Sequence, residues 1–289
     1  MSDARVEQGP ELAVTGSTGW LGGLVAHDLA GRAVAQRLLV RDLARAPELP
    51  HAVPAQCSYG DGAAAERALA GVRTLLMVSA AEQEDRLAEH RAFVDAAAAA
   101  GVEHVVYVSF FGAAPTATFT LARDHWATEE HLKASGMAWT FLRDNLYLEF
   151  MDHMVGDDGV IRGPAGHGRA AVVSHADIAR AAVAVLLDPG AHAGSTYDLT
   201  GPEALSLTEM ATVISEVTGR EVTFHDETVE EAYASRAVYG APDWQVDAWV
   251  STYTAIRQGE LDGVSDHVER LTGRRPTSLR EHLVAATST

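Results

Sequence analysis

The chain has 289 residues, 47% of them hydrophobic, which is enough for one large core or for a main domain with a smaller appendage. Its 22 basic and 40 acidic residues give a net charge of −18, and a chain this acidic repels phosphate backbones, so no nucleic-acid partner is expected. The single cysteine, Cys57, excludes an internal disulfide and predicts a cytoplasmic location. The sequence has no apolar run of the roughly 18–20 residues that a membrane helix needs, and its polar start lacks the core of a signal peptide.

Short apolar runs alternate with helical patterns through the first half of the chain. The expected strands, in chain order, are residues 12–15, 37–40, 56–59, 74–78, 105–108 and 139–142. Helices are expected between them, among others at about 82–100 and 125–135, each ending at a glycine. Continuous apolar strands between helices indicate an α/β fold with a parallel, doubly wound sheet of the Rossmann type, covered on both faces.

The carboxyl ends of these strands carry polar residues and a glycine. In a sheet of this kind the ligand lies beyond the carboxyl ends, so side chains from several strands line one crevice. The residues expected there are Gly16, Arg41, Asp61, Ser79, Ser109 and Asn145.

The alternating pattern stops after Asn145. A glycine-rich stretch at 156–168 is followed by expected helices at 177–187 and 206–218, strands at 197–200 and 222–224, and a largely helical remainder. We therefore expect residues 1–150 to form a dinucleotide-binding Rossmann domain. Residues 151–289 are expected to form a smaller, mixed but mostly helical lobe that is interleaved with the first domain and binds the substrate.

Three glycines directly after the first expected strand carry the clearest functional signal. Gly16, Gly19 and Gly22 form G-x-x-G-x-x-G between a strand and a helix. In such a motif the first glycine permits a tight turn, the second lets backbone N–H groups approach a pyrophosphate, and the third lets helix and strand pack closely. The helix N-terminus adds about half a positive charge toward the phosphates.

The end of the second expected strand indicates which dinucleotide binds. An acidic residue there would hold the free ribose 2′-hydroxyl of NAD, but this chain has Arg41 first, then Asp42, with Arg45 one helical turn further on. Arginine matches a 2′-phosphate in charge and geometry, so NADP(H) is expected in preference to NAD(H). Asp42 has a simpler interpretation as the N-cap of the turn that follows it.

The sequence resembles the NmrA-like branch of the atypical short-chain dehydrogenase/reductases, and within it the bacterial NADPH:quinone oxidoreductases. The resemblance covers nearly the whole chain, most firmly residues 12–150. It implies that Arg41, Ser79, Asn145 and the turn lie against the cofactor, and that the C-terminal lobe shapes the substrate pocket. The matching stretches are Thr15 to Gly22, Leu39 to Asp42, Tyr59 to Asp61, Val106 to Ser109, Thr128 to Gly136, Phe141 to Asn145 and Pro276 to Leu279. The turn residues expected at the cofactor are Gly16, Ser17, Thr18, Gly19, Trp20 and Leu21; Arg45 and Asp61 complete the set.

One departure from ordinary short-chain dehydrogenases concerns the proton donor. Those enzymes use a serine with Tyr-x-x-x-Lys; here Ser109 stands at the serine position, whereas Leu121 and His125 occupy the tyrosine and lysine positions. Ser109 either binds the substrate oxygen or caps the loop after its strand. His125 either replaces the acid, since its unperturbed pKa near 6.5 suits proton delivery, or contacts the ribose, or is a helix residue without a titrating role. Without the usual donor, the proton can come from solvent or from the substrate.

Aromatic and thioether side chains follow the later strands and are expected to line a flat apolar substrate pocket, although about half of them are equally interpretable as core. They are Phe110, Phe111, Trp126, Tyr147, Phe150 and Met151. No metal is expected, because the sequence contains neither H-x-x-x-H nor C-x-x-C.

These observations predict an NADPH-dependent reductase of a quinone or of an aromatic, polyketide-like ketone, acting as a monomer or homodimer. The alternative is a non-enzymatic redox sensor of the NmrA type, which binds the dinucleotide and signals through a partner. An aromatic-lined crevice favours the enzyme, and a closed or polar crevice favours the sensor.

Overall fold

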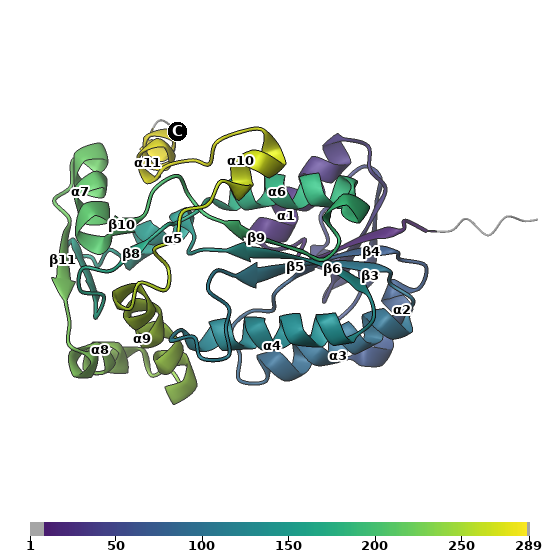
Figure 1. Cartoon of the computed structure of the whole chain (residues 1–289), viewed down its shortest axis with the longest axis horizontal. Coiled ribbons are helices and arrows are strands. Elements are labelled where there is room, and N and C mark those ends of the chain that lie inside the picture. The colour runs from purple at the N-terminus through teal and green to yellow at the C-terminus, as the bar shows by residue number, and fades with distance from the viewer. Residues whose placement is uncertain (1–8, 288–289) are drawn as a thin grey trace, which may run out of the picture.

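A seven-stranded parallel sheet forms the centre of the molecule in a computed structural model that describes residues 9–287 (Figure 1). Its strand order is β3-β2-β1-β4-β5-β6-β9, so the direction of winding reverses between β1 and β4. In open α/β sheets the ligand crevice lies at such a switch point. The predicted doubly wound Rossmann-type sheet is thus confirmed. The strands are β1 (Leu12–Thr15), β2 (Gln36–Val40), β3 (Ala52–Gln56), β4 (Thr74–Val78), β5 (His104–Phe110), β6 (Ala138–Asp144) and β9 (Ser195–Leu199).

Helices cover both faces of the sheet, because successive side chains of each strand point to opposite sides. On one face the core contains Val14, Leu76 and Val108, packed under α1 (Trp20–Gly31), α6 (His175–Leu187) and α10 (His267–Thr272). The opposite face carries Leu75, Tyr107 and Phe141. That face is covered by α2 (Gly62–Leu69), α3 (Arg86–Ala99) and α4 (Thr120–Ala134) (Figure 1).

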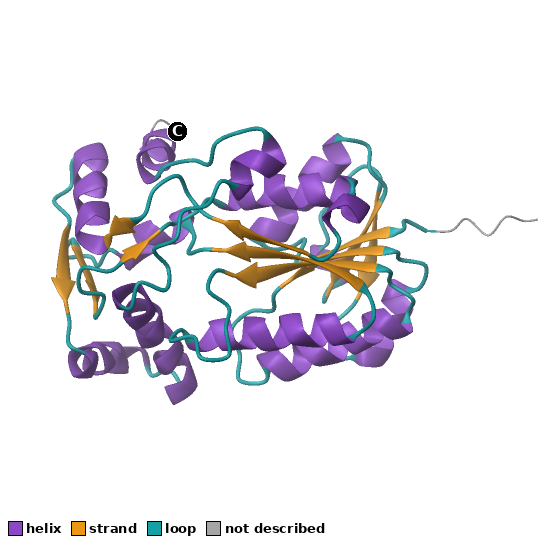
Figure 2. Ribbon diagram, in the orientation of Figure 1, coloured by secondary structure: helices purple, strands orange, loops and turns teal. Residues whose placement is uncertain are grey.

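A smaller lobe lies beyond the carboxyl ends of the strands and has its own apolar core, which includes Ile161, Leu207 and Ile256 (Figure 2). It contains two short strand pairs, β7 (Val160–Gly163) with β11 (Thr223–Asp226) and β8 (Arg169–Ala170) with β10 (Leu205–Ser206). Within residues 9–287, no helix has the length and apolar character required to cross a membrane. The remaining helices are α5 (Leu148–Met151), α7 (Leu207–Thr218), α8 (Val229–Arg236), α9 (Asp243–Arg257) and α11 (Leu279–Thr287), with short 3-10 turns at η1 (Leu43–Arg45), η2 (Asp152–Met154), η3 (Pro189–His192) and η4 (Ala237–Tyr239).

Some predicted boundaries were wrong. The third strand is β3 (Ala52–Gln56) rather than 56–59: it is the edge strand, carries Pro54, and leaves Val53 53% exposed, so it lacks the continuous apolar run used to find strands. Helix α4 begins at Thr120, five residues before the predicted start, and α3 begins at Arg86 rather than near 82.

The second half of the chain also contributes to the sheet. β9, whose residues were expected in the small lobe, pairs in parallel with β6, and α6 packs beside α1. A parallel pairing between segments about fifty residues apart leaves no local mark in the sequence. The second half of the chain thus supplies a strand to the sheet and a helix to its cover, while the division into two interleaved domains near residue 150 stays a prediction.

Candidate functional site

The turn between β1 and α1 needs two of its glycines for steric reasons within the chain. Gly16 has φ +66°, a conformation that side chains with a Cβ rarely adopt. A Cβ built on Gly22 would lie 2.4 Å from the carbonyl oxygen of Gly16, because α1 passes directly over the end of the strand. Both positions therefore require glycine whether or not a ligand is bound.

Gly19 has no such internal reason. Its φ of −101° is ordinary, and a Cβ there would meet only the Gly16 oxygen, at 3.4 Å. Helix α1 begins after it with no side-chain cap and no acidic residue in its first turn, which leaves N–H groups available to an anion. The hydroxyl of Ser17 is buried without a hydrogen-bond partner among the described residues. This turn fits a dinucleotide pyrophosphate, because it combines open space above Gly19, free N–H groups at the start of α1 and an unpartnered Ser17 hydroxyl.

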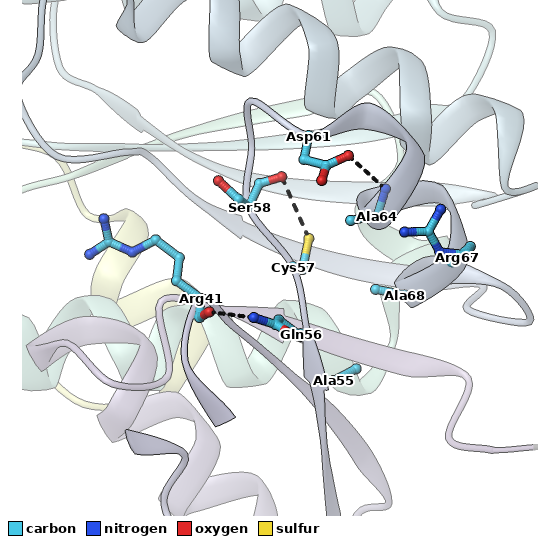
Figure 3. A pocket seen from close by; sticks show the side chains of 9 residues that line it. All are labelled: Arg41, Ala55, Gln56, Cys57, Ser58, Asp61, Ala64, Arg67 and Ala68. Atoms are coloured by element: carbon cyan, nitrogen blue, oxygen red, sulfur yellow. Dashed lines mark hydrogen bonds between the residues drawn. The ribbon is translucent and has the colours of Figure 1, made fainter. Parts of the chain in front are cut away.

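A pocket of about 550 Å³ lies beside the carboxyl ends of β2 and β3 (Figure 3). Arg41 reaches it from the end of β2, and Arg67, which the sequence analysis did not single out, reaches it from α2. Arg45 is exposed in η1 and does not line this pocket. The residues that line it are Arg41, Ala55, Gln56, Cys57, Ser58, Asp61, Ala64, Arg67 and Ala68.

Two aspartates near this pocket cap helical turns. Asp42 accepts a hydrogen bond from the backbone nitrogen of Ala44 at 3.0 Å, as its interpretation as an N-cap expects. Asp61 caps α2 by accepting one from Ala64 at 3.0 Å. The predicted contact between Asp61 and the cofactor stays a prediction, and one of its carboxylate oxygens already has a partner.

Ser79 and Asn145 follow β4 and β6, where the resemblance placed cofactor contacts. Ser79 is half-buried at the strand end. The side chain of Asn145 is fully buried: its amide nitrogen donates to the Leu261 oxygen at 3.1 Å, and its oxygen accepts from the Leu146 nitrogen at 2.8 Å. Asn145 thus joins the end of β6 to the C-terminal segment, and its contact with the cofactor stays a prediction.

Ser109 is fully buried at the end of β5 and donates to Glu129 Oε1 on α4 at 2.6 Å. Arg143, its neighbour on β6, donates to both oxygens of Glu129 at 2.8 and 2.6 Å. Because Glu129 has no exposed surface, these bonds satisfy a buried carboxylate. The hydroxyl hydrogen of Ser109 is engaged, so only its lone pairs remain for a substrate.

His125 is also buried, on the α4 side of the sheet. Arg86 Nη2 donates to its Nε2 at 2.8 Å, so Nδ1 carries the hydrogen and donates to the Tyr107 hydroxyl at 2.9 Å. Burial, and next the charge of Arg86, lowers the pKa of His125 well below 6.5. A neutral imidazole with partners on both nitrogens favours the interpretation as a helix residue without a titrating role.

A second histidine belongs to the same buried network. His90 accepts from the Ala80 nitrogen at 2.9 Å through Nε2. Its Nδ1 lies 3.0 Å from the hydroxyl of Thr128, which itself donates to the Asp124 oxygen. Burial is the main cause that lowers the pKa of His90 to about 3. The network thus joins α3, α4 and β5 below the crevice with neutral imidazoles.

The predicted substrate residues divide into two groups. Phe110 and Met151 are buried and belong to the apolar core of the small lobe. Phe150 is 56% exposed. The half-buried residues are Phe111, Trp126 and Tyr147. Their contact with a substrate stays a prediction. In residues 9–287, no group of three or more histidine, cysteine, aspartate or glutamate side chains is arranged to hold a metal ion.

A cluster that sequence reasoning missed lies where β6, α5 and α6 meet. Tyr147 donates to Asp144 Oδ2 at 3.0 Å, and its ring lies 4.1 Å from that of His175. Burial raises the pKa of Asp144 well above its ordinary value, against the effect of the Tyr147 hydrogen bond. The two segments meet through a bridge between Tyr147 and Val173, a contact that no local sequence signal announces.

A parallel sheet with an uncapped glycine turn at its switch point defines a Rossmann-type dinucleotide-binding protein. The chain belongs to the NmrA-like family, which it matches over residues 9–248. The resemblance inferred from the motifs is thereby confirmed.

Two curated relatives and one solved structure show how far the similarity extends. The chain is 34% identical to quinone oxidoreductase 2 of Escherichia coli, over 93% of this chain and 96% of the relative. It is 32% identical to the NAD(P)H azoreductase of Xenophilus azovorans, over 93% of this chain and 96% of the relative. The crystal structure of the NADPH-dependent quinone oxidoreductase of E. coli with NADPH superposes with a TM-score of 0.87 at 33% identity, over 96% of this chain and 99% of the other.

Proposed function

We propose that this protein is an NADPH-dependent reductase of quinones or related aromatic compounds. The observation that carries the proposal is Gly19, whose open surroundings have no use within the chain but suit a pyrophosphate. Relatives of nearly full length that are named as a quinone oxidoreductase and an azoreductase support the same chemistry. The sheet then binds the cofactor, and the lobe beyond the strand ends contributes the substrate side.

The cofactor would be held by groups that the chain presents at the strand ends. The uncapped N–H groups at the start of α1 bind the pyrophosphate, and Arg41 binds the 2′-phosphate that distinguishes NADPH from NADH. Arg67, on the opposite side of the pocket, adds a second positive charge. When bound, NADPH supplies the hydride.

The substrate would lie on the lobe side of the crevice, against exposed aromatic surface such as Phe150. Ser109 and His125 are buried and already hydrogen-bonded, so neither is placed to donate a proton there. Acceptors that hydride transfer converts into a stabilised anion suit such a site, because that anion can persist until it is protonated. Quinones meet this requirement, since they give a phenolate, whereas simple ketones give a strongly basic alkoxide and do not.

We further propose that the protein acts in the cytoplasm as a monomer or homodimer and binds no nucleic acid. The net charge of −18 supports the last point, and the single cysteine, Cys57, is buried and unpaired.

The test is NADPH consumption with a panel of quinones, azo compounds and aromatic ketones, with NADH measured in parallel. We expect turnover with quinones and a preference for NADPH. Tight NADPH binding without turnover of any acceptor would instead favour the sensor.

A further inference from the structure

A carboxylate and an imidazole form a pair at the start of α6. Both oxygens of Glu149, on α5, accept the backbone N–H of His175, at 3.0 and 3.2 Å. Oε2 of the same carboxylate lies 2.8 Å from Nδ1 of the ring. The side chains of His175 and Glu149 are 13% and 22% exposed, so the pair is sheltered but reachable from solvent. One carboxylate thus fixes both the backbone and the ring of His175.

The imidazole lies between the glycine turn and the end of β6. Its ring centroid is 6.1 Å from that of Trp20, the first residue of α1 after Gly19, and 4.1 Å from that of Tyr147. Nδ1 faces Glu149 as an ion-pair contact rather than a well-angled hydrogen bond, and the other corner of the ring is Nε2, for which no hydrogen bond or ion pair occurs among residues 9–287. Trp20 and the segment that carries Tyr147 both follow carboxyl ends of strands, where the cofactor and substrate meet in this fold.

We propose that His175, held by Glu149, is the proton donor for the reduction, a role that rests on the proposed function. Hydride from the bound dinucleotide carries two electrons to the quinone and leaves one oxygen as a phenolate. The proton moves from Nε2 of His175 to that oxygen and completes the hydroquinone. The neutral imidazole then takes a proton from solvent, so each cycle consumes one hydride and one proton.

The charges around the ring suit this role. Burial raises the pKa of Glu149, but hydrogen bonds from the side chain and backbone of His175 outweigh it, so the pKa lies below its usual value and the group is anionic near neutral pH. An anion beside Nδ1 fixes the orientation of the ring, so that Nε2 is the nitrogen left for a substrate.

The other titratable groups that face the pair are few. Tyr147 and Asp144 bond to each other beneath the ring. On the same helix, Asp177 is paired with Arg180 and accepts a hydrogen bond from the hydroxyl of Ser174, the N-cap of α6. The first turn of α1 carries no charged side chain. Among the described residues, Glu149 is therefore the charged group that contacts the imidazole.

The experiment compares turnover against pH for the wild type, His175→Gln and Glu149→Gln, with menadione and with an aromatic ketone. Wild-type turnover falls as pH rises through the pKa of the imidazolium, because the acid must be protonated. In His175→Gln this limb is lost, and turnover at pH values below the limb drops at least about tenfold, which is the size of effect expected when a general acid is removed. In Glu149→Gln the limb remains and moves to lower pH. His167→Gln, at an exposed histidine, is the matched control and behaves as wild type.

Two measurements do not depend on turnover. In the cofactor-free protein, nitrogen NMR of the His175 ring shows that Nδ1 carries its hydrogen toward Glu149, and Glu149→Gln alters the Nδ1 signal. Calorimetry shows NADPH affinity in His175→Gln within about twofold of wild type, so the variant has kept its fold and cofactor site.

The outcomes separate the two proposals. An active wild type whose pH limb survives in His175→Gln overturns the donor role alone. Loss of NADPH affinity with an unchanged pH profile also overturns it and makes His175 a cofactor contact. A wild type that consumes no NADPH with any acceptor overturns the proposed function and the donor role with it.

Discussion

Replacing Gly19 by valine separates the fold of the turn from its ligand. The backbone of Gly19 is in the extended region, and a Cβ there touches only the Gly16 oxygen, at an ordinary 3.4 Å. The variant is therefore expected to fold, with a loss of unfolding free energy of no more than about 1–2 kcal/mol from the poorer N-cap. The branched side chain instead occupies the space that a pyrophosphate needs.

The size of the binding loss follows from the N–H groups that the side chain shields. Helix α1 starts without a side-chain cap, so its first N–H groups are free to bond a phosphate. A hydrogen bond to a charged group contributes about 1.5–3 kcal/mol. Losing two of them costs about 3–6 kcal/mol, which corresponds to roughly 10²–10⁴-fold weaker affinity for NADPH.

Calorimetric titration with NADPH, beside urea unfolding, measures both quantities. Gly31→Ala, at the other end of α1, where a Cβ meets nothing within 4 Å, serves as a control that keeps full affinity. Gly22→Ala is the opposite case, since its Cβ would overlap the Gly16 carbonyl, and it should lose stability as well as binding. Normal NADPH affinity in folded Gly19→Val would refute the reasoning, and the turn would then be structural only.

Three further predictions concern the strand-end residues and the buried network. Arg41→Ala should weaken NADPH binding by about 1.5–3 kcal/mol while NADH binding changes little, and Arg45→Ala, outside the pocket, should have the smaller effect. Equal weakening of NADPH and NADH binding by Arg41→Ala would contradict the assignment of Arg41 to the 2′-phosphate. His125→Phe should change turnover less than about tenfold but lower the unfolding free energy by about 1–3 kcal/mol, because Arg86 loses a buried hydrogen-bond partner. A hundredfold loss of turnover in a stable variant would instead identify His125 as the proton donor. The pKa of His90 is about 3 in the fold and 6.5 when unperturbed, so below pH 6.5 the unfolded chain binds a proton that the folded chain does not, and the unfolding free energy of the wild type falls by up to about 1.4 kcal/mol per pH unit on acidification. Urea midpoints of His90→Gln, measured across this pH range, should lack this fall, and a pH dependence identical to that of the wild type would disprove it.

Local patterns in the sequence identified the sheet and the glycine turn correctly. A strand followed directly by G-x-x-G-x-x-G has few backbone solutions, because Gly16 must adopt a positive φ and Gly22 must pass close to the strand. Continuous apolar runs likewise report strands that are buried on both faces. The edge strand β3 failed this test, because one side of it faces solvent and Val53 is exposed.

The sequence by itself thus determined the fold class, the family and the place where a pyrophosphate fits, since each depends on residues that are neighbours in the chain. Only the tertiary structure decided which strand-end side chains face the crevice. Ser109 points to Glu129 and His125 to Arg86, and both are buried by helices far away in sequence. His175 lies beside Trp20 because α6 packs beside α1. Side-chain direction depends on register and on hydrogen bonds between distant segments, and no local pattern records either.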